Sequence, residues 1–241
     1  MSLLDFPTHD QCQALSTLFR GDLCTSLTGR SGARMERGRR IYCQGDTSTS
    51  VYFVRAGLIK TCLITEDGKE QILRIYQPGE VFGELCFCAT ARREEALALE
   101  DSEIVELSFV ELIGHLQRNP AALASFLSAI SHHLADAYEQ VRLLSSEKVM
   151  ARLAQTLLRL AQEIGDPEGA WIRLRITLTQ EDVARMIGAR REVTSTLLNQ
   201  LRALGCVDYS ARTPGRLLVK PVELRRFRQT PSSKLQESIR C

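Results

Sequence analysis

The spacing of hydrophobic residues changes twice along the chain and divides it into three stretches. Between about residues 38 and 110, short apolar runs rich in β-branched and aromatic residues are separated by turns that contain Gly and Asp. Short strands at a regular spacing of about 8–12 residues are typical of a β-sandwich or barrel. We predict a jelly roll, with strands at 41–43, 51–54, 58–65, 71–76, 97–99 and 104–107.

A long helix is predicted next. Asn119 is a suitable N-cap, and Pro120 fits the first helical position. Apolar residues then recur at alternating spacings of four and three, which is the heptad pattern of a coiled-coil seam. The seam consists of Leu123, Leu127, Ile130, Leu134, Ala137, Val141 and Leu144. Because this stripe is narrow, we favour pairing with a second copy of the chain; packing against the chain's own sandwich is the alternative.

The third stretch has the pattern of a small domain that mixes helices and strands. Residues 147–164 form an amphipathic helix, 165–169 a tight turn, and 171–176 an alternating strand. Thr179, followed by Asp182 three residues later, predicts the start of a short helix. Two predictions concern the segments outside these three stretches. Short helices are expected within residues 8–32, and the hydrophobic pattern is lost after Phe227.

Gly188 separates that short helix from a second one at 190–204. Two short helices joined by a glycine-containing turn predict a helix-turn-helix, whose second helix lies in the DNA major groove. The polar side of the second helix carries Arg190, Arg191, Glu192, Ser195, Thr196 and Asn199. Its inward side consists of Val193, Leu197, Leu198 and Leu201. A hairpin around 214–215 predicts a wing.

The polar side chains of the second helix are suited to reading bases. Arg191 can donate two hydrogen bonds to a guanine, and Glu192 can accept one from a cytosine amino group. An Arg–Glu pair within the protein is the alternative. We expect contacts to the DNA backbone from Thr179, Arg190, Arg212, Arg216 and Lys220, although the last three also fit a solvated charged loop.

Composition and charge narrow the function classes. The chain has 241 residues with 44% hydrophobic and 25% charged, which are ordinary globular values. Residues 1–145 carry 14 basic and 19 acidic side chains, and residues 146–220 carry 12 and 8. A net charge of −5 followed by +4 favours a polyanionic partner for the second half. The N-terminus lacks the pattern of a signal peptide and no long apolar run occurs, so we expect a cytoplasmic protein that is not membrane-bound.

The eight cysteines are Cys12, Cys24, Cys43, Cys62, Cys86, Cys88, Cys206 and Cys241. None of them forms the C-x-x-C spacing of a common metal site. Buried, unreactive thiols are favoured over a metal or redox role. The sequence also lacks a nucleophile–base motif, a Gly-rich phosphate loop and an H-x-x-x-H pattern, so we do not expect an enzyme.

Three motifs together resemble those of the CRP/FNR family of bacterial transcription regulators. They are the helix-turn-helix sequence at 178–198, Gly-Glu-Leu at 83–85, and the sequence at 152–158. The resemblance covers nearly the whole chain. It implies an α+β architecture: a cyclic-nucleotide-binding-like jelly roll at 1–115, a dimerisation helix at 116–145, a winged helix-turn-helix at 146–228, and a flexible tail at 229–241.

The resemblance also implies partners and base-reading residues. The family forms homodimers on palindromic DNA sites and contacts RNA polymerase through a loop that falls near 165–171. It reads a G·C pair of a TGTGA-like or TTGAT-like half-site through residues that match Arg191 and Glu192. A third reader is expected at Ser195 or Thr196. Ser195 matches the FNR-like pattern, whereas the Arg that both patterns have at the place of Thr196 is absent.

The ligand pocket of the family is degenerate in this sequence. Its expected residues are Gly83, Glu84, Leu85, Arg93, Glu94, Glu95, Ala137 and Tyr138. Relatives that bind cyclic AMP have an Arg-Ser pair, whose Arg neutralises the cyclic phosphate, where this chain has Glu94 and Glu95. Arg93 is one residue early, so strand alternation turns it to the opposite face unless a one-residue deletion or bulge re-aims it. We therefore do not expect control by cyclic AMP.

Other effectors remain open from the sequence. One alternative is redox or metal sensing by an iron–sulfur cluster on Cys12, Cys24, Cys43 and either Cys86 or Cys88. A second is a different nucleotide such as cyclic di-GMP. Haem-sensing relatives use a histidine, and His115, His132 and His133 are available, although the adjacent pair fits an exposed helix face better.

Overall fold

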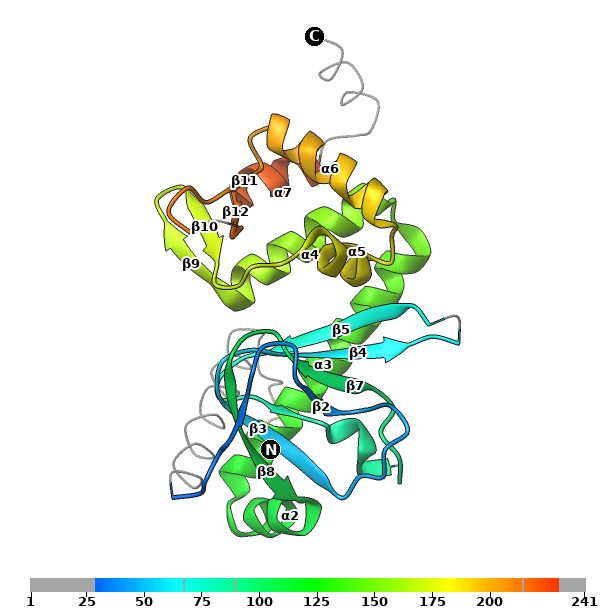
Figure 1. The fold of residues 1–241 in the computed structure, drawn as a ribbon, viewed down its shortest axis with the longest axis vertical. Coiled ribbons are helices and arrows are strands. Elements are labelled where there is room, and N and C mark those ends of the chain that lie inside the picture. Colours follow the sequence, from blue (N-terminus) through cyan, green and yellow to red (C-terminus); the bar gives the residue numbers. More distant parts are fainter. Residues whose placement is uncertain (1–28, 67, 89, 214, 230–241) are drawn as a thin grey trace, which may run out of the picture. The chain divides into compact units, whose positions relative to one another are not determined.

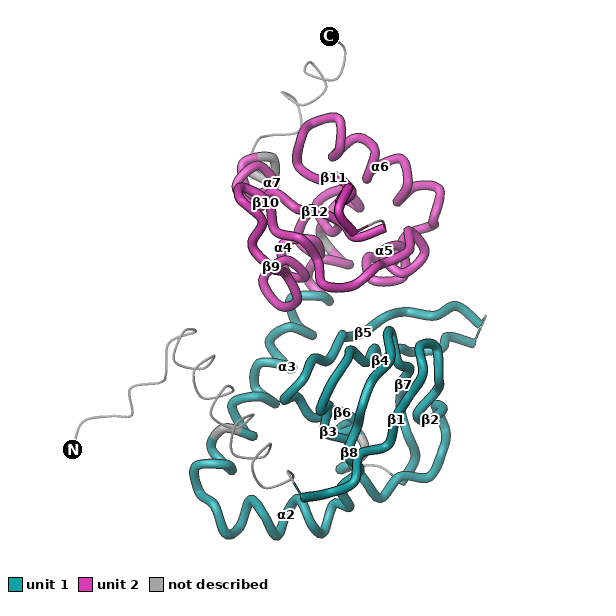
Figure 2. The backbone as a smooth tube through the Cα atoms, turned by 60° about the vertical axis from the view of Figure 1, so that its left-hand side comes forward, with its two compact units in different colours: residues 1–140 teal, residues 141–241 magenta. Residues whose placement is uncertain are grey.

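The computed structural model describes residues 29–66, 68–88, 90–213 and 215–229 (Figure 1). The chain divides into two compact units, residues 1–140 and 141–241 (Figure 2). The predicted boundary near residue 145 stays a prediction. The helices expected within 8–32 and the tail expected at 229–241 lie almost wholly outside the described residues.

The first unit contains two four-stranded sheets whose neighbouring strands are all antiparallel. One sheet has the order β1 (Ala33–Met35), β8 (Ser102–Ser108), β3 (Ser50–Ala56) and β6 (Val81–Phe82). The other has the order β2 (Arg40–Tyr42), β7 (Glu95–Ala98), β4 (Ile59–Ile64) and β5 (Glu70–Tyr76). This arrangement confirms the predicted jelly roll and the α+β class.

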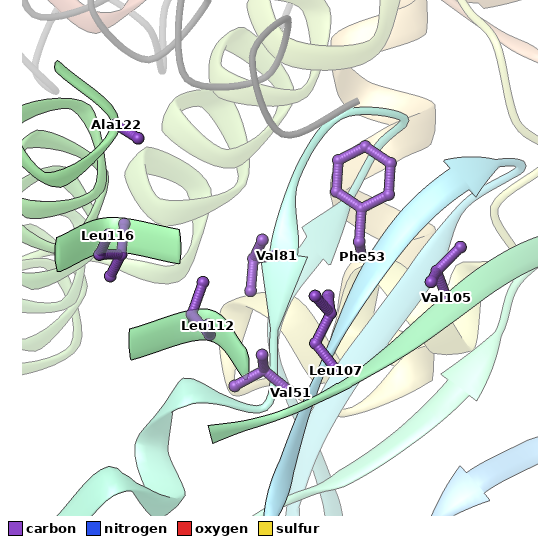
Figure 3. Packing of buried hydrophobic residues seen from close by; sticks show 8 residues of the cluster. All are labelled: Val51, Phe53, Val81, Val105, Leu107, Leu112, Leu116 and Ala122. Carbon is purple, nitrogen blue, oxygen red and sulfur yellow. The ribbon is translucent and has the colours of Figure 1, made fainter. Parts of the chain in front are cut away.

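Two hydrophobic clusters stabilise this jelly roll. One lies between the sheets and includes Val54, Ile59, Phe82 and Ile104. The other joins a sheet to helix α2 (Phe109–Arg118) (Figure 3). It consists of Val51, Phe53, Val81, Val105, Leu107, Leu112, Leu116 and Ala122. Full burial of each large side chain contributes about 1.5–3 kcal/mol, so these clusters hold the sheets and helix together.

Helix α3 (Pro120–Ser146) begins where the sequence predicts, because the Asn119 side chain accepts a hydrogen bond from the Ala122 amide at 3.1 Å. The predicted stripe along α3 lies largely exposed in the single chain. Leu127, Leu134 and Val141 are 56%, 51% and 61% exposed. Apolar side chains in such a row are otherwise buried in a folded protein, so α3 presents an unpaired apolar face.

The second unit packs helices against a small antiparallel sheet. Helix α4 (Val149–Ile164) and the sheet share a core that includes Leu153, Leu157 and Leu174. The sheet order is β11 (Val207–Tyr209), β12 (Leu217–Val219), β10 (Trp171–Leu174) and β9 (Gly165–Glu168). Helices α5 (Gln180–Ile187), α6 (Arg191–Ala203) and α7 (Pro221–Gln229) complete this unit. Strands β11 and β12 confirm the predicted hairpin.

Two local predictions in this unit need correction. Residues 165–169 are not a simple tight turn, because β9 pairs with β10 in register Ile172↔Pro167. Strand β9 is the edge of the sheet, where a proline without an N–H is tolerated. Helix α7 is not predicted by the sequence pattern, because many charged residues surround Leu224, which is fully buried.

Candidate nucleic-acid interface and sensor pocket

The start and end of α5 are fixed by local hydrogen bonds. The Thr179 hydroxyl accepts from the Asp182 amide at 3.0 Å, and the Thr179 amide donates to the Asp182 carboxylate at 3.0 Å. The sequence predicts the start of a helix at Thr179, and the structure shows that Asp182 completes a reciprocal capping box. Gly188 then takes a left-handed conformation (φ 61°, ψ 48°), which ends α5 and turns the chain toward α6.

Helix α6 buries one face and exposes the other. Thr194, Leu198 and Leu201 are buried at helical spacing. Val193, which was predicted to face inward, is 42% exposed, and Thr194 takes the buried position instead. The Thr194 hydroxyl can be buried because it donates to the Arg190 carbonyl at 3.0 Å. Val193 is therefore a candidate for apolar contact with a thymine methyl group that the sequence pattern did not reveal.

The predicted base readers lie around the exposed N-terminal turns of α6. Arg191 and Glu192 are exposed, and within the residues that the structure describes they form no ion pair with one another. Thr196 is also exposed, and its hydroxyl donates to the Glu192 carbonyl at 3.0 Å. Ser195 is half-buried. The side chains that can meet DNA first are therefore Arg191 and Glu192.

The residues predicted to contact DNA phosphates differ in their exposure and in their contacts within the protein. Thr179 and Arg190 are exposed, and Arg216 is half-buried. The Arg212 guanidinium is 82% exposed and lies 4.0 Å from Glu168 of β9. The Lys220 ammonium lies 5.1 Å from the centre of the Trp171 ring. The ion pair of Arg212 is an exposed, weak contact that a DNA phosphate can replace.

Arg152 on α4 holds the turn between α5 and α6, a role that the sequence did not show. Its guanidinium donates to the carbonyls of Ile187 at 2.8 Å, Glu147 at 3.0 Å and Gly188 at 3.4 Å. These oxygens lie at the end of α5 and just before α4, where carbonyls lack helical partners. Arg152 therefore fixes the angle at which α6 leaves the turn.

We expect Arg152→Ala to destabilise the second unit by about 2–3 kcal/mol, because three carbonyls lose a charged donor. Site-specific DNA affinity is expected to fall by at least tenfold, since α6 loses its fixed direction. Chemical denaturation and fluorescence anisotropy on the same samples measure both. Arg152→Lys should restore part of each loss, and Arg225→Ala, which removes an exposed cation from α7, is the control. An Arg152→Ala variant with unchanged affinity would contradict this role.

The first unit (residues 1–140), which contains the jelly roll and which we call the sensor unit, has a buried polar cluster built around Glu84. This residue begins the short 3₁₀ helix η1 (Glu84–Cys88). Its Oε1 lies 3.0 Å from His133 Nδ1 of α3, and the Tyr76 hydroxyl donates to it at 3.4 Å. The prediction of an exposed His132–His133 pair is wrong, because both residues are half-buried and the His133 ring also packs edge-on against Tyr76. The second oxygen of Glu84 is buried without a hydrogen-bond partner among the described residues.

Glu94 extends this cluster, and Glu95 does not. The Tyr42 hydroxyl donates to Glu94 at 3.0 Å. Burial, followed by the charge of Glu84, raises the pKa of Glu94 to about 7. Burial likewise raises the pKa of Tyr42 and Tyr76, so both stay protonated. Glu95 instead forms an ion pair with Arg40 at 3.0 Å, so the two predicted carboxylates do not act together.

Arg92 is buried, which the sequence pattern does not predict. Its guanidinium donates to the carbonyls of Gly83 at 3.0 Å and Ser50 at 2.8 Å, and lies 4.1 Å from the centre of the Tyr42 ring. A Cβ atom at Gly83 would come within 2.6 Å of this guanidinium. Arg93 is exposed. The buried guanidinium of Arg92 is therefore bound to backbone oxygens.

The other predicted pocket residues are not drawn into this cluster. Leu85 is 43% exposed and Tyr138 is 67% exposed, and Ala137 is exposed beside it on α3. Both α3 residues lie on or next to the apolar stripe, so they face the surface of the single chain.

The cysteines divide between described and undescribed positions. Cys43 is half-buried, and Cys62 and Cys206 are buried as free thiols. Burial and a hydrogen bond to Glu70 raise the pKa of Cys62, which keeps it protonated. Cys12, Cys24 and Cys241 lie outside the described residues, and nothing is described of the side chains of Cys86 and Cys88. No metal-binding group of three or more His, Cys, Asp or Glu residues occurs in the described part of the chain.

Comparisons with known proteins match both units. The family model of the cyclic nucleotide-binding domain matches residues 33–119, and that of the Crp-like helix-turn-helix domain matches residues 151–227. The chain is 31% identical over 196 residues to the anaerobic regulatory protein of Bacillus subtilis, spanning 80% of this chain and 82% of that protein.

Two further similarities cover most of the chain. A CRP-like cAMP-activated global transcriptional regulator of Mycobacterium tuberculosis is 29% identical over 178 residues, spanning 73% of this chain and 80% of that protein. The structure of a CooA mutant from Carboxydothermus hydrogenoformans superimposes with a TM-score of 0.71 at 24% identity, covering 85% of this chain and 90% of that chain. No helix in the described residues is long and apolar enough to cross a membrane. The chain belongs to the CRP/FNR family of DNA-binding transcription regulators.

Proposed function

We propose that this protein is a homodimeric regulator that reads a palindromic DNA site with α6. The observation that carries this proposal is the exposed N-terminal turn of α6, with Arg191 and Glu192 beside each other and not paired to one another. A guanidinium and a carboxylate at this place match the two bases of a G·C pair. Ser195, Thr196 and Val193 are the flanking readers.

Affinity comes from contacts that do not read sequence. Thr179, Arg190, Arg212, Arg216 and Lys220 are the proposed phosphate contacts. Each neutralised phosphate releases counterions, so binding weakens steeply with salt. RNA polymerase is the proposed second partner, through the segment 165–171, where Asp166 and Glu168 already pair with Arg173.

The proposed dimer contact is the apolar stripe of α3. Seven residues at heptad spacing form one narrow row, of which Leu127, Leu134 and Val141 are more than half exposed. A second α3 helix offers the same row in return, which is how a two-fold interface is built. Two copies of α6 then face two half-sites of a palindrome.

We further propose that cyclic AMP does not control this protein. The charges in the pocket support this, because Arg92 is bound to backbone carbonyls while the carboxyls of Glu84 and Glu94 are buried together. A cyclic phosphate brought to this place meets carboxylate charge and no available guanidinium. The side chains at this place therefore disfavour an anionic ligand.

DNA selection from a random duplex library tests the proposal, at one fixed salt concentration. The wild-type protein is expected to recover a two-fold symmetric site without any nucleotide, and added cyclic AMP should leave the site and affinity unchanged. Cyclic di-GMP forms a third arm. Recovery of no site, or of a site only with cyclic AMP, would contradict the proposal.

Selection with Glu192→Ala is expected to relax the preference at one base pair in each half-site, with a discrimination loss of about 1–3 kcal/mol per base pair. The remaining positions should keep their preference, because Arg191 is unchanged. Glu223→Ala in α7 removes a carboxylate of the same unit outside α6 and is the matched control. An unchanged selected site in Glu192→Ala would show that Glu192 does not read a base.

A further inference from the structure

The interior of the sensor unit holds several carboxyls where an apolar core is the norm, and those of Glu84 and Glu94 belong to one cluster. Glu84 and Glu94 are 9% and 1% exposed. A buried carboxylate is costly unless it is paired or accepts hydrogen bonds. Two tyrosine hydroxyls supply such bonds, from Tyr42 to Glu94 and from Tyr76 to Glu84. The second oxygen of Glu84 has no hydrogen-bond partner among the described residues, so the cluster is most stable when it carries little negative charge.

Charged and titratable groups face Glu94 from each element packed around it. Strand β2 contributes Tyr42, η1 contributes Glu84, and the segment before β7 contributes Arg92. The charges of both carboxyls raise the pKa of Tyr76 of β5. Helix α3 joins the cluster through His133, which contacts Glu84. Burial and the charge of Glu84 raise the pKa of Glu94 from the ordinary 4.5 to about 7.

The cluster is connected to α3 at two neighbouring turns. His133 lies 3.0 Å from Glu84, and Asp136 accepts from the Arg74 guanidinium at 2.8 Å. Arg74 in turn lies 3.4 Å from Glu80. Helix α3 is the element that carries the proposed dimer seam, and it continues to Ser146 in the second unit.

We propose that the proton is an effector of this regulator. Gain or loss of a proton by Glu94 changes the strength of the contact between Glu84 and His133, and thereby the affinity for DNA. This inference rests on the proposed DNA-binding function. It assigns a regulatory role to the sensor unit in a chain whose pocket charges disfavour a cyclic phosphate.

The physical sequence follows from charge. At low pH the Glu94 carboxyl is neutral, and Glu84 is the carboxyl that holds His133. As the pH rises through about 7, Glu94 releases its proton to water, and two like charges then repel within a buried cluster. The strands are held by their ladders of backbone hydrogen bonds. The contact with half-buried His133 is the one that yields, so α3 is held less firmly at pH 8 than at pH 6.

The stability of the folded state changes in the same direction. Because the pKa of Glu94 is raised by folding, its protonated form stabilises the folded state fully below about pH 4.5, and this stabilisation is lost as the pH rises through about 7. The direction is opposite to that of an ordinary salt-bridged carboxylate, whose contribution grows with pH.

The test compares the wild-type chain with Glu94→Gln, which mimics the protonated carboxyl, between pH 6 and pH 8. Specific DNA affinity of the wild type is expected to change by threefold or more across this range, and that of Glu94→Gln to stay level. Glu66→Gln, at an exposed turn between β4 and β5, controls for loss of a carboxylate. Hydrogen exchange of α3 around His133, corrected for the intrinsic rate, should be faster at pH 8 in the wild type alone.

A second variant separates the buried acid from its connection to α3. His133→Phe keeps a ring against Tyr76 but removes the contact with Glu84. Its thermal midpoint should keep the wild-type pH dependence, because Glu94 is still buried, whereas the pH dependence of DNA affinity should be lost. Retention of that dependence in His133→Phe would overturn the route through α3.

Failure of the inference and failure of the proposed function give different results. Specific binding with the same pH profile in the wild type and Glu94→Gln, together with equal exchange of α3, would overturn the proton effector and leave the regulator intact. Absence of specific binding at every pH would overturn the proposed function, and the exchange of α3 would then decide whether protons act on the sensor unit.

Discussion

Replacing Arg191 by Ala is expected to abolish sequence-specific DNA binding while leaving the fold intact. Arg191 is exposed at the start of α6 and has no partner within the described chain, so its removal leaves no buried group unsatisfied. A bidentate contact to guanine is worth about 1–3 kcal/mol, and a palindrome contains two of them. The expected loss is roughly 30-fold to 10⁴-fold in specific affinity.

Competition binding with specific and random duplexes at fixed salt measures this loss. Non-specific affinity should fall only slightly in Arg191→Ala, because base contacts add little to it. Arg212→Ala is the contrasting variant: its 82% exposed guanidinium is a phosphate contact, so specific and random affinity should fall together and the salt slope should decrease. If Arg191→Ala lowered both affinities equally, Arg191 would be a phosphate contact and not a base reader.

The fold could be predicted from the sequence wherever local patterns decide it. The turns of the jelly roll, the cap at Asn119 and the capping box of α5 all depend on residues close in sequence. Strand β9 could not be predicted in this way. Its Gly, Asp and Pro residues favour a turn, and only pairing with β10 makes it a strand.

The same distinction applies to the candidate site: local spacing predicts some of its residues, and others depend on packing. The exposure of Arg191 and Glu192 follows from helical spacing alone, whereas that of Val193 depends on which face of α6 packs against the rest of the unit. The buried residues of the ligand pocket could be predicted least well. Residue 92 precedes β7, so strand alternation does not describe where its side chain points, and the buried guanidinium of Arg92 went unrecognised.

His133 shows how a long-range contact overrides a local pattern. Two adjacent histidines between apolar heptad positions fit an exposed helix face when the helix is considered alone. In the structure, the jelly roll packs against that side of α3, and Glu84, 49 positions earlier, meets the imidazole. Contacts between residues far apart in sequence depend on packing, which is why the polar cluster of the sensor unit emerged only from the structure.

Replacing Leu134 by Glu is expected to convert the protein to monomers and to lower its specific DNA affinity by more than 100-fold. Leu134 is 51% exposed in the single chain, so the carboxylate stays hydrated in the monomer and the fold is retained. In a two-fold seam the substitution occurs on both helices. Each copy loses about 1.5–3 kcal/mol of apolar burial, and two carboxylates face each other across the interface.

A substitution at the neighbouring residue, Ala135, is the control for this prediction. Ala135 is exposed on the same helix outside the heptad stripe, so Ala135→Glu adds the same charge without entering the seam. Sedimentation should show a monomer for Leu134→Glu and a dimer for the wild type and Ala135→Glu. A monomer covers only one half-site, and losing the second set of base and phosphate contacts accounts for the fall in affinity. A Leu134→Glu protein that remained dimeric would place the interface elsewhere, and one that unfolded would show that the stripe packs against its own chain.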